Sequence, residues 1–178
     1  FGLAAQRSEL LATEGGSAQQ AVDWVRSNGK PYTRTGFYDS YGASGDLVQL
    51  PITFYGSKFN SIELIAGWSY DTRNRSIFAD RGMRHSLSLA YTLPGSDVEY
   101  YTANYEFLKF YPLWWGFTFA TRANVGYGNK LGDTSALPPY RQFFAGGPDT
   151  VRGYRESRLG PKDDFGNPYG GNLLTTGS

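Results

Sequence analysis

Apolar and polar residues alternate along several stretches of this chain. In residues 62–70 the even positions carry Ile, Leu, Ala, Trp and Tyr, while the odd positions are mostly small or polar. Alternation with a period of two is typical of a β-strand that has one apolar and one polar face. The same pattern predicts about five strands, near residues 1–12, 62–72, 85–94, 99–111 and 117–128.

The lengths of these strands favour a membrane protein. Turn-forming residues separate them at 94–97, 112–116 and 128–133. Strands of about 9–11 residues can cross a bilayer at a tilt, whereas strands of soluble sandwiches are usually about 5–6 residues long. Trp and Tyr near strand ends are typical of membrane interfaces. They are Trp68, Tyr70, Tyr100, Tyr101, Tyr111, Trp114, Trp115 and Tyr127. The pattern predicts an all-β, antiparallel transmembrane β-barrel segment.

One short helix is predicted among the strands. Ser17 is a candidate N-cap for residues 18–28, and Gly29 suits the position just past the helix end. We expect this helix to pack on a loop. Residues 30–61 are compatible with an extra hairpin through residues 47–55, where Pro51 argues against a central strand.

Composition excludes several classes of function. Arg and Lys total 17 and Asp and Glu total 16, so a net charge of +1 gives no electrostatic case for nucleic-acid binding. The absence of Cys excludes disulfides, thiol catalysis and zinc–thiolate sites. No apolar run approaches the length of a membrane helix, and the first residues do not resemble a secretory signal. A search for long apolar runs does not detect barrel strands, because their apolar residues alternate with polar ones.

No enzyme chemistry is expected. His85 is the only histidine and has no nucleophile in a recognisable motif, so we interpret it as a surface or barrel-lining side chain. Asp163 and Asp164 fall in a loop, where Asp is expected on backbone grounds. The pairs Gly146–Gly147 and Gly170–Gly171 lack the following Lys-Ser/Thr of a phosphate loop. We therefore expect no catalytic residue, cofactor or metal.

The segment 140–155 carries the most distinctive local pattern. Gly153 permits a tight bend, so Arg152 and Tyr154 can project from a compact loop tip. An Arg at such a tip can bind a carboxylate in bidentate fashion if the tip enters a polar lumen. The residues alone favour an ordinary solvent-exposed hairpin loop.

The run Gly146–Tyr154 resembles the Val-Arg-Gly-Phe/Tyr signature of the bacterial surface antigen family, a superfamily of outer-membrane assembly factors and two-partner-secretion transporters. In that family the signature lies at the tip of the sixth extracellular loop, which is folded back into the barrel. The resemblance continues at residues 67–74, 81–82, 93–96, 100–101, 144–147, 159–161 and 170–172.

The resemblance implies that residues 1–178 form part of a sixteen-stranded barrel domain, roughly strands seven to eleven and the opening of strand twelve. A surface loop with the short helix and an insertion would span about 13–61, and the sixth extracellular loop about 129–171. Both ends of the chain are expected to lie inside strands. About five strands cannot close a barrel, so the POTRA domains and the remaining strands are expected outside this chain.

The implied function is the folding and insertion of β-barrel proteins into the bacterial outer membrane. The functional loop motif would be Val151, Arg152, Gly153 and Tyr154, supported by Gly146, Gly147, Gly160 and Pro161. Arg152 would brace the barrel interior against acidic partners on later strands. The implied partners are nascent outer-membrane barrel proteins, assembly lipoproteins acting mainly through the POTRA domains, and outer-membrane lipid. The alternatives are a related two-partner-secretion or autotransporter-assembly barrel, and a soluble β-sandwich binding module.

Overall fold

A single antiparallel sheet dominates the structure, a computed structural model that describes residues 1–14, 16–41, 46–148 and 150–178. Asp149, within the run Gly146–Tyr154, lies outside the described residues. The strands are β1 (Gly2–Thr13), β2 (Lys30–Tyr41), β3 (Leu47–Asp71), β4 (Gly82–Thr92), β5 (Tyr100–Pro112), β6 (Thr118–Lys130) and β7 (Leu173–Gly177). The helices are α1 (Gln19–Ser27) and the short 3-10 helices η1 (Trp114–Gly116) and η2 (Pro139–Arg141).

Strand β3 organises the sheet, because it pairs with three other strands. Residues 54–65 of β3 pair with β1, and residues 47–58 pair with β2. These two ranges overlap, so β1 and β2 lie on opposite edges of β3. Further along, residues 63–71 pair with β4, and β5, β6 and β7 then follow in chain order. The result is a meander with one hairpin arm, formed by β2 and the first half of β3.

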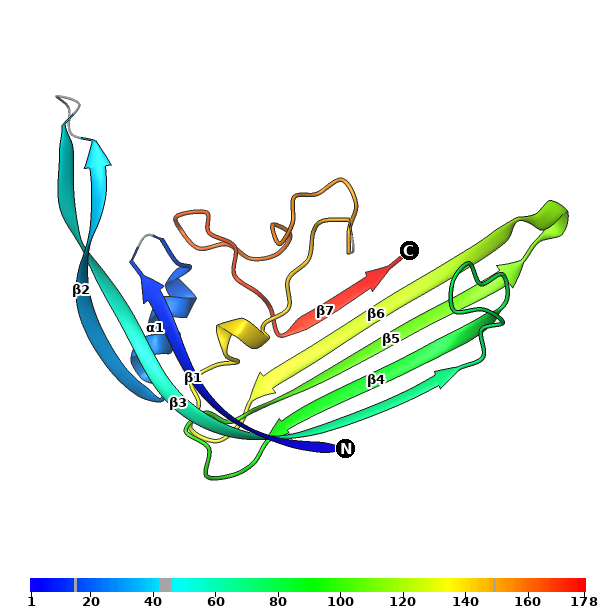
Figure 1. The fold of residues 1–178 in the computed structure, drawn as a ribbon, viewed down its shortest axis with the longest axis horizontal. Coiled ribbons are helices and arrows are strands. Elements are labelled where there is room, and N and C mark those ends of the chain that lie inside the picture. Colours follow the sequence, from blue (N-terminus) through cyan, green and yellow to red (C-terminus); the bar gives the residue numbers. More distant parts are fainter. Residues whose placement is uncertain (15, 42–45, 149) are drawn as a thin grey trace.

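The sheet has two chemically different faces. Figure 1 shows it curved, with α1 and the long segment between β6 and β7 on its concave side, which we call the inner face. Strand pairing and alternation place polar or small residues there: Glu63, Gly67, Ser69, Arg84, Ser86, Ser88, Thr102, Asn104, Glu106, Arg122, Asn124 and Gly126. The outer face carries Ile62, Leu64, Trp68, Tyr70, Leu87, Leu89, Tyr91, Tyr101, Tyr105, Phe107, Phe119, Val125 and Tyr127. The sequence-predicted alternation is confirmed.

The buried core lies at one end of the sheet, where α1, the middle of β3 and the start of the long segment meet. Its members are Ala12, Val22, Trp24, Val25, Phe59, Val98, Tyr100 and Leu137. The Trp24 ring meets Phe59 edge-on at 5.6 Å between centroids, and Phe59 stacks on Tyr140 at 5.9 Å. The apolar outer face of the sheet contributes nothing to this core.

Two local expectations need correction. The strand expected near 62–72 begins at Leu47, because the expected hairpin through 47–55 is continuous with it. Pro51 fits there because β3 at that point pairs only with β2, so it lies on an edge. Ser17 is not the N-cap of α1: Ala18 holds that position, and the Ser17 hydroxyl accepts a bond from the Thr13 N–H.

Tyr100 is also not part of an interfacial belt. Its side chain is fully buried on the inner face. Neighbouring residues of a strand face opposite ways, so Tyr101 takes the outer face. The β-sandwich alternative is wrong, since the described strands form one sheet with no second sheet packed on it. Among the described residues, no helix is long and apolar enough to cross a membrane.

Candidate functional site

The long segment 131–172, which we call the long loop, folds back onto the inner face of the sheet. Its two arms are bridged in steps. The N–H groups of Phe143 and Gly171 each donate to the carbonyl of the other at 2.9 Å. Further out, the Leu159 N–H donates to the Ala145 carbonyl at 3.0 Å. The arms therefore converge toward a tip at residues 147–148 and 150–154 (Figure 1).

Glycines make this tip possible. Gly146, Gly147, Gly153 and Gly160 all have positive φ angles, between 88° and 122°. Residues with a side chain rarely adopt this conformation, so the sequence-predicted supporting glycines have a backbone role. The Thr150 hydroxyl closes the turn, accepting from the Gly146 N–H at 2.9 Å and donating to the Gly146 carbonyl at 2.8 Å. The Pro161 carbonyl accepts the Tyr169 N–H at 3.1 Å in the returning arm.

The predicted motif residues reach the inner face next to β6 and β7. Val151 and Arg152 line a cavity of about 580 Å³ together with Arg122 and the last residues of the chain, from Thr175 to Ser178. Tyr154 is exposed. Within the described residues Arg152 forms no ion pair. The structure thus brings the tip to the sheet, and the role of Arg152 as a brace stays a prediction.

A different arginine binds the long loop to the sheet. Arg141, in η2, places its Nη2 atom 2.8 Å from both carboxylate oxygens of Glu63 in β3. Its Nε donates to the Tyr100 hydroxyl at 2.9 Å, and that hydroxyl donates in turn to Glu63. Glu63 is 4% exposed and Arg141 is 33% exposed. This mostly buried triad, which we call the clasp, fixes the root of the long loop.

The electrostatics of the clasp keep Arg141 charged. Burial alone would lower the pKa of the Arg141 guanidinium, but its interactions with Tyr100 and Glu63 outweigh burial and raise that pKa. The neighbouring Tyr140 shares this environment, and burial raises the pKa of its phenol. The rings of Tyr100 and Tyr140 also lie beside the guanidinium, with centroids 5.5 Å and 5.7 Å from the Arg141 Cζ atom. Sequence reasoning missed the clasp.

The helix α1 holds the long loop from the other side. The Trp24 indole N–H donates to the Ala136 carbonyl at 2.9 Å, and the Ser135 N–H donates to the Asn28 side-chain oxygen at 2.8 Å. The Asp163 carboxylate accepts the Gln19 N–H at 3.1 Å, which caps the first turn of the helix. The helix α1 and the long loop are therefore held together by these bonds.

Close packing seats the middle of the long loop on the inner face of the sheet. The Phe143 ring covers Gly126 of β6, and a side chain at that glycine would meet the ring at about 2.5 Å. Asn104 of β5 lies beside the same position. Glycine is needed at this point because the loop approaches the strand so closely.

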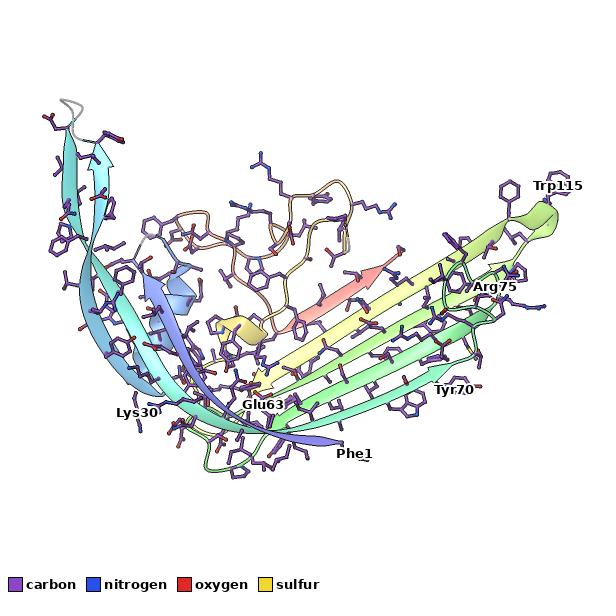
Figure 2. The ribbon with its side chains drawn as sticks, in the orientation of Figure 1. Phe1, Lys30, Glu63, Tyr70, Arg75 and Trp115 are labelled. Atoms are coloured by element: carbon purple, nitrogen blue, oxygen red, sulfur yellow. The ribbon has the colours of Figure 1, made fainter. Side chains whose placement is uncertain are left out.

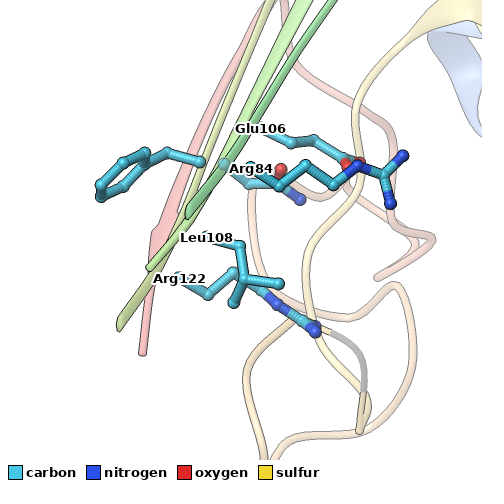
Figure 3. A pocket seen from close by; sticks show the side chains of 6 residues that line it. Arg84, Glu106, Leu108 and Arg122 are labelled. Carbon is cyan, nitrogen blue, oxygen red and sulfur yellow. The ribbon is translucent and has the colours of Figure 1, made fainter. Parts of the chain in front are cut away.

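Charged side chains continue along the inner face below the loop. Arg84, Glu106 and Arg122 line a cavity of about 200 Å³ with Leu108 and Asn124. Figure 3 shows Arg84, Glu106 and Arg122 pointing from the strands toward the side of the loop. The inner face is thus polar and charged at the level of the motif tip.

The single histidine lies among aromatic side chains. The His85 ring belongs to the outer face, where its Nδ1 lies 2.7 Å from the Tyr105 hydroxyl and its ring centroid 5.0 Å from that of Phe107. Within the described ranges no group of three His, Asp or Glu side chains could hold a metal ion.

A match to a protein-family model identifies the family of this chain. Residues 2–178 match the Omp85 superfamily domain. The chain belongs to the Omp85 superfamily. Its curved antiparallel sheet is accordingly the wall of a β-barrel, open in this chain, and the expected fold class is confirmed.

Individual Omp85 relatives cover the chain to different extents. Over 110 residues it is 34% identical to the outer membrane protein assembly factor BamA of Neisseria meningitidis serogroup B, covering 60% of this chain and 14% of the relative. It is 30% identical over 92 residues to a SAM50-like protein of Drosophila melanogaster, covering 52% of this chain and 21% of that protein.

A solved structure shows the same fold. The crystal structure of BamA from Haemophilus ducreyi lacking POTRA domains 1-3 matches with a TM-score of 0.71 at 23% identity, over 98% of this chain and 32% of that chain. The chain thus spans about a third of that structure and less than a quarter of either curated relative.

Proposed function

We propose that this chain is part of the barrel of an outer-membrane assembly protein, which folds and inserts β-barrel proteins into the bacterial outer membrane. The observation that carries the proposal is the long loop, whose Val-Arg-Gly-Tyr tip lies against the inner face while the clasp fixes its root. The likeness to a curated assembly factor supports the same function. The proposal needs no bond-making chemistry and no cofactor.

The domain assignment belongs to this proposal. The surface loop assigned to about 13–61 would include α1 and the hairpin arm, although residues 54–61 of β3 already pair with β1 in the sheet, and the sixth extracellular loop would span about 129–171. The parent protein would carry its POTRA domains and further strands elsewhere. Nascent barrel proteins, assembly lipoproteins and outer-membrane lipid are the proposed partners. A nascent strand would pair with an exposed strand edge by β-augmentation.

Within the proposed assembly protein, Arg152 braces the barrel interior. Arg152 and Arg122 line the same cavity on the inner face. Because two cations that share a cavity repel, we propose that carboxylates on other strands of the parent barrel neutralise them. Val151, Gly153 and Tyr154 shape the tip that presents Arg152.

Complementation tests the proposal. A strain depleted of its resident assembly factor receives the full-length parent protein, the Arg152→Ala variant or the Arg155→Ala variant. Arg155 is an exposed arginine of the same loop and serves as the matched control. We expect the parent and Arg155→Ala to restore outer-membrane protein levels, and Arg152→Ala to fail and to lose heat-modifiability. Unchanged behaviour of Arg152→Ala would refute the bracing role, and failure of the parent would refute the assembly function.

A further inference from the structure

Two lysines face each other across the base of the hairpin arm. Lys30 of β2 is the cross-strand partner of Lys58 of β3, so both side chains lie on the same face of the sheet. Figure 2 shows Lys30 at the start of β2, on the convex side. Both lysines are exposed, and neither forms an ion pair within the described part of the chain. Like charges in directly opposed positions repel, so an anion that binds both ammonium groups would stabilise the sheet here.

Two arginines extend this charge along the same outer face. Arg34 lies four residues beyond Lys30 on β2, an even spacing that keeps it on that face. Arg7 of β1 pairs with Asn60, which lies two residues beyond Lys58 on β3. Neither arginine forms an ion pair among the described residues. These four cations form what we call the basic cluster: Arg7, Lys30, Arg34 and Lys58.

Two carboxylates border the basic cluster, and both are bound to uncharged partners. Glu9 of β1 is the cross-strand partner of Lys58, but its carboxylate accepts the Tyr32 hydroxyl. Asp97 accepts the backbone N–H of Asn60 at 2.8 Å and its side-chain amide at 3.1 Å. Four cations and two carboxylates leave this part of the outer face with a net charge of +2. The surface therefore attracts anions.

Aromatic rings hold two of the cations in place. The Lys58 ammonium lies 5.2 Å from the centroid of the Tyr32 ring, and the Arg34 Cζ atom lies 5.7 Å from that of the Phe54 ring. A cationic side chain that packs along a ring keeps its charge at the surface. Because such a side chain is already ordered, it loses less conformational entropy when a ligand binds. The basic cluster is thus partly preorganised.

The basic cluster borders the apolar part of the outer face. On β3 the next outward-facing residues after Asn60 are Ile62 and Leu64, which are 41% and 44% exposed. Leu3 of β1, the cross-strand partner of Leu64, is 69% exposed. A lipid can therefore place its acyl chains on this wall while its headgroup meets the cations. A soluble anion would use the cations alone.

The spacing of the cations favours two anionic groups. Lys30 and Lys58 are cross-strand neighbours, with Cβ atoms about 5 Å apart. Arg34 lies four residues further along β2, about 13 Å away at the rise of a strand. One phosphate fits between the two ammonium groups, and a second fits the guanidinium, whose planar donors match phosphate geometry.

We propose that the basic cluster binds a membrane lipid whose headgroup carries two phosphate groups, with its acyl chains against Ile62 and Leu64. The hairpin arm supplies Lys30 and Arg34, so this site gives the arm a role in holding the headgroup. The inference goes beyond the proposed assembly function and needs only the lipid-facing wall. Its failure would leave that function standing.

Native mass spectrometry of the detergent-solubilised full-length protein measures this binding as lipid adducts. The probes are bisphosphoryl lipid A, monophosphoryl lipid A and inorganic phosphate. The test variants are Lys30→Gln/Lys58→Gln and Arg34→Gln, and the control is Lys109→Gln. Lys109 is a matched control because it lies on the outer face at the other end of the sheet, with its ammonium 4.6 Å from the centroid of the Tyr111 ring.

We expect the parent and Lys109→Gln to bind bisphosphoryl lipid A more tightly than the monophosphoryl form. Lys30→Gln/Lys58→Gln should bind it roughly 25-fold more weakly than the parent, about fivefold for each cation. Arg34→Gln should lose most of the preference for the second phosphate.

Three results would overturn parts of this proposal. Equal affinity of the parent and Lys30→Gln/Lys58→Gln for bisphosphoryl lipid A would overturn the site. Equal binding of the two lipids by the parent would overturn the second phosphate position. Displacement of the lipid by an equal concentration of inorganic phosphate would assign the basic cluster to a soluble anion and overturn the lipid.

Hydrogen exchange shows whether the opposed lysines serve a ligand or the fold. Without lipid A, Lys30→Gln should slow amide exchange in β2 by roughly 1.5- to 5-fold, because it removes the repulsion from Lys58. Added bisphosphoryl lipid A should slow exchange in the parent more than in the variant. Faster exchange in the lipid-free variant would show that Lys30 itself stabilises the hairpin, and would overturn the repulsion from which the proposal is argued.

Discussion

Arg141 and Glu63 lie 78 positions apart in the chain, yet the guanidinium contacts both carboxylate oxygens at 2.8 Å. One residue belongs to the root of the long loop and the other to the wall of the barrel. Tyr100 completes the contact from β5. A loop of more than 40 residues thus has a fixed origin on the inner face, from which its tip reaches β6 and β7.

Breaking the clasp should release the loop root. Glu63→Gln leaves the Arg141 charge without its partner in a mostly buried site, and we expect a cost of about 2–3 kcal/mol, at the low end for a buried pair because Arg141 is partly exposed. Hydrogen exchange at the Phe143 and Gly171 amides in the full-length protein would then accelerate by roughly 30- to 150-fold.

A double-mutant cycle separates the clasp from general damage. Glu63→Gln and Arg141→Gln together should cost less than the sum of the two single changes, because the residues interact directly. Arg158→Gln, an exposed arginine of the same loop, is the control and should leave the exchange rates unchanged. Additive effects at Glu63 and Arg141 would contradict a direct ion pair.

Gly126 and Gly67 offer a matched pair on the inner face, since both are strand glycines in one cross-strand row. Gly126→Val should displace the Phe143 ring and destabilise loop docking by about 1–3 kcal/mol. A Cβ added at Gly67 meets nothing within 4 Å, so Gly67→Val should be tolerated. Loop docking is read from protection of the Phe143 amide. Equal effects of the two substitutions would argue against the Phe143 contact.

Acid should loosen the contact between α1 and the long loop. Burial would raise the pKa of Asp163, but bonds from Asn167, Gln19 and Phe165 outweigh it and lower that pKa. A carboxylate whose pKa is lowered by folding stabilises the protein fully above its unfolded pKa, about 3.9, and loses this contribution as pH falls through the folded value. The fluorescence of Trp24 should report the loss below about pH 4.

Asp163→Asn should remove this acid-dependent step, because its amide cannot titrate. Asp164→Asn provides the neighbouring control, since the bonds to α1 and within the turn are made by Asp163. An identical acid response in Asp163→Asn and the parent would show that another group controls the contact.

The wall of the barrel was predictable because period-two alternation encodes it locally. The stretch 62–70 identifies its strand and both its faces without any tertiary information. The first half of β3 was harder to predict, because Pro51 cannot donate to a central ladder and its edge position depends on where β1 begins to pair. The N-cap of α1 was predicted wrongly because the carboxylate that caps the helix is distant in the sequence. Asp163 lies 144 residues away from Gln19 and reaches it only in the folded chain.

The candidate site was predictable only where a local motif marks it. The tip around Arg152 has a recognisable sequence, and the glycines that support it have the positive φ angles that such a turn needs. The clasp has no comparable motif. Its single signal was Glu63, a carboxylate on the inner face of a predicted strand, and its partner Arg141 could be found only once the loop was folded.

Folding of a barrel substrate by the purified full-length protein tests the central claim most directly. An unfolded outer-membrane β-barrel protein is added to phospholipid vesicles that contain the parent, Arg152→Ala or Glu63→Gln, and its folded fraction is followed by the heat-dependent shift in gel mobility. We predict that the parent accelerates folding over empty vesicles and that both variants lose most of this acceleration. Equal rates with the parent and with empty vesicles would contradict the assembly function.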